Sequence, residues 1–138
     1  MKKILSVLLC LAVLFSFASC FGNTDPEALW DSAIYKTDTE LGEGSKTVYV
    51  EVVVEDNSVT FTIHTDRTIL GDALVDQSLV EGEQGAYGLY VKKVNGITAD
   101  YDVDHSYWGF YKNGEYLLTG VDTTEFTDGD HYELIYSK

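Results

Sequence analysis

The stretch "TVYVEVVVEDNSVTFTIHT", residues 47–65, decides the fold class of this chain. Apolar and polar side chains alternate along both of its halves, as in β-strands that bury one face and leave the other in water. One face carries Val48, Val50, Val52 and Val54 in the first half, and Val59, Phe61 and Ile63 in the second. "DNS" at residues 56–58 is typical of a turn, so the stretch predicts an antiparallel pair of strands.

The hydrophobic period changes to that of a helix directly after this pair. In "TILGDALVDQSLV", residues 68–80, the apolar side chains fall on one stripe of a helix. The stripe consists of Ile69, Leu70, Ala73, Leu74 and Leu79. We expect Thr68 or Asp66 to cap the helix, Gly71 to mark a close contact with the sheet, and Gly82 to end the helix. An acidic loop is expected to follow.

Further strand patterns complete the chain. They are "GLYVKKV" at 88–94, "YWGFYK" at 107–112, "EYLLTG" at 115–120 and "HYELIYS" at 131–137. Asn113-Gly114 between two of them is a strong hairpin signal, because both residues accept positive φ. Strands around one helix predict an α+β fold with a mostly antiparallel sheet, in the β-grasp (ubiquitin-like) arrangement. We expect this domain to span residues 47–138, after a flexible linker at 20–46.

The N-terminus has the pattern of a secretion signal. In "MKKILSVLLCLAVLFSFASC", two lysines precede an apolar run that ends in small residues before Cys20. "FASC" resembles the bacterial lipoprotein signal, which implies cleavage after residue 19 and lipidation of Cys20. The protein would then be extracytoplasmic and lipid-anchored to the bacterial cell membrane. The alternative is an uncleaved N-terminal anchor helix.

Charge and motifs exclude several classes of function. The formal net charge is −14 at pH 7, which repels phosphate backbones and argues against nucleic acid as a partner. Removal of Cys10 with the signal and lipidation of Cys20 would leave the domain without a thiolate nucleophile or a disulfide. No Ser-His-Asp order and no glycine-rich phosphate loop stands out. The sequence therefore predicts a non-enzymatic protein.

The succession of the helix and the later strands resembles the C-terminal β-domain of transcobalamin and intrinsic factor, and the bacterial domains of unknown function grouped with it. The matching residues are Gly88, Leu89 and Val91; Asn95 and Ile97; Tyr107, Trp108 and Phe110; and Gly120 and Asp130. The resemblance implies a β-grasp-like domain and a link to corrinoid (cobalamin-like) binding. In the animal carriers a separate helical domain holds the other face of cobalamin, and this chain shows no such domain.

Three alternating carboxylates precede the central aromatic strand. Asp100, Asp102 and Asp104 have the spacing of positions one, three and five of an EF-hand calcium loop. That loop also needs a glycine at position six and a glutamate at position twelve, where this chain has His105 and Tyr111. Two hypotheses stay open: a looser calcium site on the three aspartates, and a solvated acidic loop between strands.

The aromatic residues beside this acidic segment are the second candidate site. Alternation places Tyr107 on one face of its strand and Trp108 on the other, and an aromatic face suits a flat ligand. We take Tyr107, Trp108, Tyr101 and His105 as candidate ligand contacts; an imidazole such as His105 can also ligate corrin cobalt. The leading hypothesis is that the protein binds a corrinoid or a similar small ligand and passes it to an uptake transporter. The alternatives are a divalent-metal (calcium) module and a surface adhesion or scaffold module.

Overall fold

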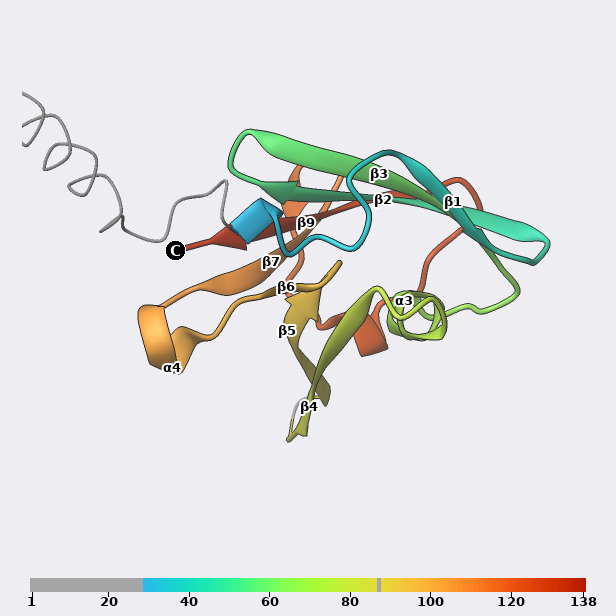
Figure 1. Ribbon diagram of the computed structural model, residues 1–138. Coiled ribbons are helices and arrows are strands. Elements are labelled where there is room, and N and C mark those ends of the chain that lie inside the picture. The colour runs from blue at the N-terminus through green and yellow to red at the C-terminus, as the bar shows by residue number, and fades with distance from the viewer. Residues whose placement is uncertain (1–28, 87) are drawn as a thin grey trace, which may run out of the picture.

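The structure is a computed structural model that describes residues 29–86 and 88–138 (Figure 1). The predicted signal peptide (1–19), the lipidation site Cys20 and the first residues of the predicted linker lie outside this part and stay predictions. Within the described residues, no helix is both long enough and apolar enough to cross a membrane.

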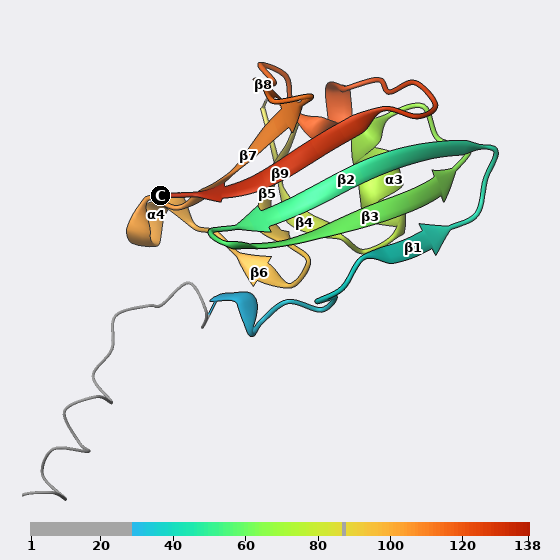
Figure 2. The ribbon, with the colours of Figure 1, turned by 90° about the horizontal axis from the view of Figure 1, so that it is seen from above.

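A six-stranded sheet forms one layer, and Figure 2 shows its strands side by side. Its order is β1 (Thr39–Gly42), β3 (Asn57–Thr65), β2 (Lys46–Val54), β9 (His131–Ser137), β7 (Tyr107–Lys112) and β8 (Glu115–Tyr116). The predicted antiparallel pair at 47–65 is confirmed as β2 and β3. β2 runs parallel to β9, and β1 runs parallel to β3, so the sheet is mixed.

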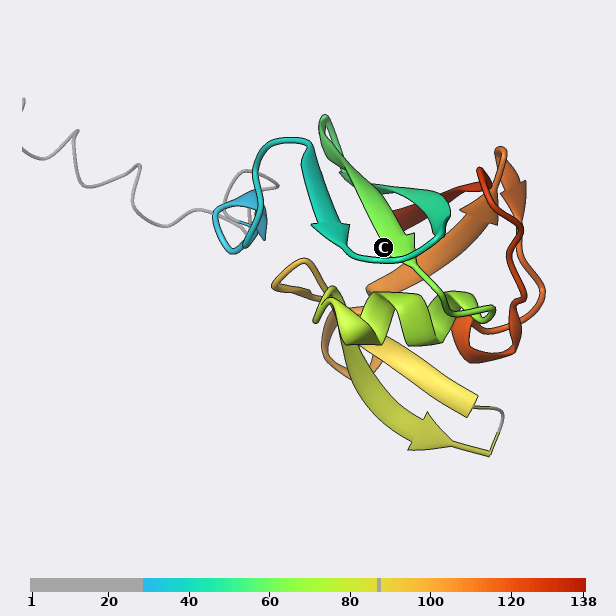
Figure 3. The same cartoon turned by 90° about the vertical axis from the view of Figure 1, so that its right-hand side faces the viewer.

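The second layer consists of helical segments and a small antiparallel sheet. The sheet contains β4 (Val80–Gly85), β5 (Gly88–Val94) and β6 (Ile97–Thr98), and the helical segments are α3 (Leu70–Asp76), α4 (Tyr101–Asp104) and the 3-10 turn η1 (Val121–Thr123). Figure 3 shows α3 and the small sheet on the same side of the large sheet. The apolar core lies between the layers, and Val48, Val50, Val52, Phe61 and Ile63 are fully buried there. This confirms the predicted inward face.

The acidic loop expected after the helix is a strand, which corrects the prediction. The segment forms β4, whose backbone pairs with β5, and the register shifts between Glu81 and Gly82. A Cβ atom on Gly82 would overlap the carbonyl oxygen of Tyr90, so the two backbones approach closely at this bulge. Gly82 therefore does not end the helix, which stops at Asp76 with Gln77 as its C-cap.

The start of α3 also differs from the prediction. Ile69 is the N-cap, with an extended backbone and no side-chain cap. Asp66 instead accepts hydrogen bonds from the backbone N–H and the hydroxyl of Ser45, both at 2.8 Å. Gly71 does mark a close contact, but with η1: a Cβ there would lie 2.9 Å from the Cα atom of Asp122. The partner is a segment that only the tertiary fold brings to the helix.

The predicted flexible linker is ordered over its second half, which moves the start of the folded domain before residue 47. β1 pairs with β3 along four residues. The Asn95 side chain accepts a hydrogen bond from the backbone N–H of Tyr35 and donates one to its carbonyl oxygen. The Tyr35 ring also packs edge-on against Phe61, with centroids 5.5 Å apart. These contacts join residues far apart in the sequence, so local pattern did not indicate them.

The described part is strand-rich with one main helix, so the α+β class is confirmed. The Asn113-Gly114 hairpin is also confirmed, with φ of 51° and 81°. β8 is shorter than predicted: it pairs with β7 only at Glu115 and Tyr116.

Candidate ligand-binding cleft

A cleft of about 500 Å³ lies between the small sheet and the β7–β8 end of the large sheet. Its lining comes from the β4–β5 hairpin (85, 86 and 88–91), α4 (Tyr101), β7 (Tyr107, Trp108 and Phe110) and residues 116–120. Because four separate segments contribute, the cleft exists only in the folded chain. We call it the aromatic cleft.

The lining of the aromatic cleft carries no Asp, Glu, Lys, Arg or His side chain among the described residues. Aromatic rings and aliphatic side chains dominate it, and its polar groups are tyrosine hydroxyls, one threonine and the backbone. The chain as a whole has a net charge of −14, so the cleft is an uncharged site on a strongly acidic protein. Such a lining favours contact with an uncharged, apolar part of a ligand.

The structure brings Tyr101, Tyr107 and Trp108 together, as the sequence predicts for a ligand site. Trp108 is 4% exposed, and its indole Nε1 donates a hydrogen bond to the Ile97 carbonyl oxygen at 3.2 Å. Tyr107 is 40% exposed. β8 covers only the far end of β7, at Tyr111 and Lys112. The cleft follows the uncovered edge of β7, so residues from both of its faces reach the cleft.

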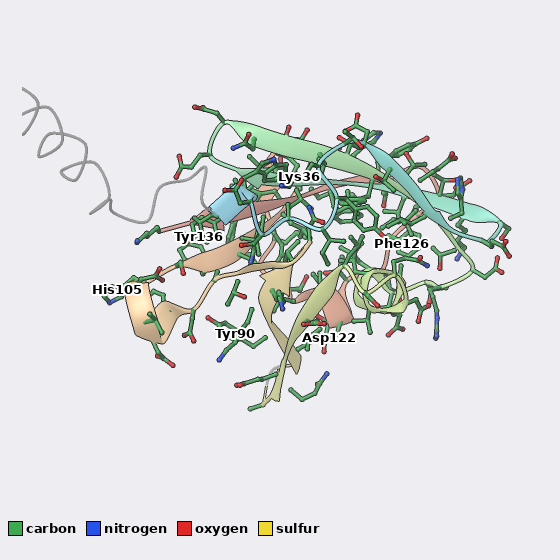
Figure 4. All side chains as sticks on the ribbon, viewed as in Figure 1. Lys36, Tyr90, His105, Asp122, Phe126 and Tyr136 are labelled. Carbon is green, nitrogen blue, oxygen red and sulfur yellow. The ribbon has the colours of Figure 1, made fainter. Side chains whose placement is uncertain are left out.

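His105 does not line the cleft, although the sequence placed it among the ligand contacts. It is the C-cap of α4 with φ of 63°, and its ring packs edge-on against Tyr101 at 5.0 Å between centroids. In Figure 4, His105 lies at the outer end of α4, whereas Tyr90 lies between α4 and β5. His105 therefore supports the ring of Tyr101 from outside the cleft.

Sequence reasoning missed part of the cleft, namely Tyr90, Tyr116 and Leu118. These side chains are 46%, 58% and 94% exposed. Tyr116 also packs edge-on against Tyr111, with centroids 5.4 Å apart. One signal was present in the sequence: Tyr116–Leu118 is a run of three apolar residues shortly after the hairpin turn. A strand with one face in water would alternate apolar and polar residues instead.

Two of the three aspartates, Asp100 and Asp104, form local hydrogen bonds at the two ends of α4. Asp100 is its N-cap, and its carboxylate accepts a hydrogen bond from the Asp102 N–H at 3.0 Å. The Asp104 carboxylate accepts hydrogen bonds from the backbone N–H and the hydroxyl of Ser106. No group of three or more His, Cys, Asp or Glu in the described residues is placed to hold a metal ion. The geometry thus gives no support to a calcium site on these aspartates, and their segment is a helical turn rather than a loop.

Hydrogen bonds from Ser106 hold the pKa of Asp104 below its ordinary value of 3.8, with Lys138 contributing at 3.7 Å. Because the folded state binds this proton less tightly, the contribution of Asp104 to stability is present above pH 3.8 and is lost as the pH falls below it. We expect the carboxyl carbon of Asp104 to titrate in NMR with a midpoint below 3.8. Ser106→Ala should raise that midpoint; an unchanged midpoint would contradict this account.

Comparison with known proteins then places the chain in a family. Residues 67–138 match a domain of unknown function, DUF4430. The chain belongs to this family. A proposed metal-binding protein from Ruminococcus gnavus has a crystal structure that matches this DUF4430 chain with a TM-score of 0.65. The two sequences are 36% identical. The match covers 68% of this chain and 98% of the other.

The fold is also similar to part of haptocorrin, solved in complex with Cbi, a small corrinoid ligand. The TM-score is 0.55 at 19% identity, and the match covers 71% of the DUF4430 chain but 26% of haptocorrin. The similarity to the transcobalamin-like domain is therefore confirmed at the level of fold. No curated protein is significantly similar to the chain.

Proposed function

We propose that this DUF4430 protein binds a small ligand with a flat ring system in the aromatic cleft and catalyses no reaction on it. The observation that supports this most directly is the lining: tyrosines and a tryptophan from separate segments converge on an uncharged hollow. Its volume of about 500 Å³ is within the usual range for small-molecule sites, roughly 300–1,000 Å³.

The exposed rim of the cleft supports the same proposal. Tyr90, Tyr101, Tyr107, Tyr116 and Leu118 are all exposed large side chains that line it. Exposed apolar side chains gathered around a hollow mark a binding site more often than solvated surface. A planar ligand would cover several rings at once, and ring stacking adds to the energy of apolar burial.

A corrinoid is our first candidate ligand, and the fold shared with part of haptocorrin supports it. The exposed rim leaves one side of the ligand uncovered, as suits a carrier that passes its cargo to an uptake transporter. In this proposal the domain is β-grasp-like, extracytoplasmic and held at the bacterial membrane by the lipidated Cys20.

A second candidate function is metal binding, because the Ruminococcus gnavus relative is a proposed metal-binding protein. Calcium needs six to eight oxygen ligands, which the uncharged aromatic cleft does not offer. This function would therefore use another part of the chain. It predicts that calcium, added after chelator treatment, raises the melting temperature of the protein.

We expect Tyr107→Ala and Tyr116→Ala each to weaken binding about tenfold, because each removes an exposed ring from the wall of the cleft. Binding is measured by titrating the purified chain with cobinamide and with Nile red, a neutral planar dye. Tyr49→Ala is the matched control, since Tyr49 packs on His131 and does not line the cleft. Equal affinities for the wild type and the three alanine variants would refute the assignment of the site.

A further inference from the structure

Asp122 in η1 lies directly behind one end of the aromatic cleft. Its Oδ2 accepts a hydrogen bond from the backbone N–H of Leu89 at 2.8 Å, and Leu89 lines the cleft. Its Oδ1 is buried and has no hydrogen-bond partner among the described residues. A buried carboxylate oxygen without a donor is costly, so this arrangement calls for an explanation other than stability.

Three glycines make room for Asp122. A Cβ on Gly71 of α3 would lie 2.9 Å from its Cα, and a Cβ on Gly120 would lie 3.2 Å from its Oδ1. Gly88, at the start of β5, has φ of 106°, and a Cβ there would lie 2.5 Å from Oδ1. Asp122 thus lies in η1 where this turn meets α3 and β5, and Figure 4 shows it near the small sheet.

The hydrogen bond to Leu89 lies at a part of β5 that has a strand on one side only. β4 pairs with β5 along its length, whereas β6 pairs only with Lys93 and Val94. On the open side, the Asp122 carboxylate takes the place of the carbonyl group that a neighbouring strand would supply. It therefore connects the first residues of β5 to the segment that carries Gly120, and both line the cleft.

We propose that Asp122 is a positioning residue of the aromatic cleft, which holds the β4–β5 hairpin in place as a wall for the ligand. The unpaired Oδ1 fits this role, since functional sites retain groups that lower stability when those groups hold a binding geometry. This inference rests on the proposed function, because its effect on affinity requires that the cleft bind a ligand.

The test compares three variants of the purified chain by hydrogen exchange of the Leu89 amide and by Nile red affinity. Asp122→Ala should speed exchange of that amide at least about tenfold and weaken dye binding about tenfold. Asp122→Asn keeps an oxygen that can accept the bond, so both values should stay near those of the wild type. Asp128→Ala is the control: it removes a similar bond, to the Thr47 N–H at 2.7 Å, away from the cleft. Its dye affinity should stay within about twofold.

The outcomes separate this inference from the proposed function. Faster Leu89 exchange with unchanged affinity in Asp122→Ala would overturn the positioning role while the cleft stays a binding site. If the wild type binds neither Nile red nor cobinamide, the proposed function fails. The exchange data then test only whether Asp122 holds the β4–β5 hairpin in place. Faster exchange of the Leu89 amide in Asp122→Ala supports this, and unchanged exchange overturns it. If Asp122→Ala does not fold, Asp122→Ser, which is too short to reach Leu89, replaces it in the same comparison.

Discussion

Trp108→Ala is expected to lower the free energy of unfolding by about 3–5 kcal/mol, the usual cost of deleting a buried aromatic side chain. Trp108 is 4% exposed, and its ring packs edge-on against Tyr136 with centroids 5.7 Å apart. Its loss would also leave the Ile97 carbonyl oxygen without the indole donor. Urea denaturation of the variant and the wild type measures the effect.

This expected loss makes Trp108→Ala a poor test of ligand binding, although Trp108 lines the cleft. Tyr107→Ala is the matched comparison from the neighbouring position of β7, and its 40% exposure should limit the cost to about 1 kcal/mol. Trp108→Phe should fall between the two, since it keeps much of the packing and loses the hydrogen bond. A loss of only about 1 kcal/mol for Trp108→Ala would contradict the account of Trp108 as a core residue.

Gly82→Ala is expected to destabilise the protein by about 3 kcal/mol, at the upper end of the usual cost of overpacking. The added Cβ would lie 2.7 Å from the Tyr90 carbonyl carbon and 2.9 Å from the Val91 Cα, so backbone atoms have to move. These atoms belong to β5, which lines the aromatic cleft. The variant should therefore also bind Nile red more weakly than the wild type.

Gly85→Ala in the same strand is the control for this prediction. Among the residues that the structure describes, a Cβ on Gly85 would meet only the Gly88 carbonyl oxygen, at 3.6 Å, which is an ordinary contact. Its effect on the melting temperature should be small. If both alanine variants melt at the same temperature, the close approach of β4 to β5 at Gly82 is not what requires a glycine there.

The strands that the sequence predicted are those with a clear alternation or a strong turn. β2 and β3 show both, and the buried residues Val50 and Phe61 lie directly opposite one another in the observed register. β4 was missed because five of its six residues are exposed, so its side chains carry no alternation of burial. β1 was missed because its parallel pairing with β3 depends on contacts between distant parts of the chain.

The candidate site was predicted in part. Tyr101, Tyr107 and Trp108 are close in sequence to one another, and they do share the cleft. Tyr90 was missed as a contact because it belongs to β5, whose place near β7 depends on long-range packing. Tyr116 was missed although its hairpin with β7 was predicted, because the hairpin pattern does not show that its side chain lines a cleft. Asp122 gave no signal at all, since its hydrogen-bond partner lies 33 residues earlier in the chain.

The sequence alone determined the α+β class, the β2–β3 hairpin, the Asn113-Gly114 turn and the acidic surface, because side-chain period, turn chemistry and charge are local properties. The tertiary structure alone decided that an uncharged aromatic cleft forms and that Asp122 meets Leu89. Each of these depends on which distant backbones pack together. Local periodicity reports which face of a strand is buried, but it does not report the segment that covers that face.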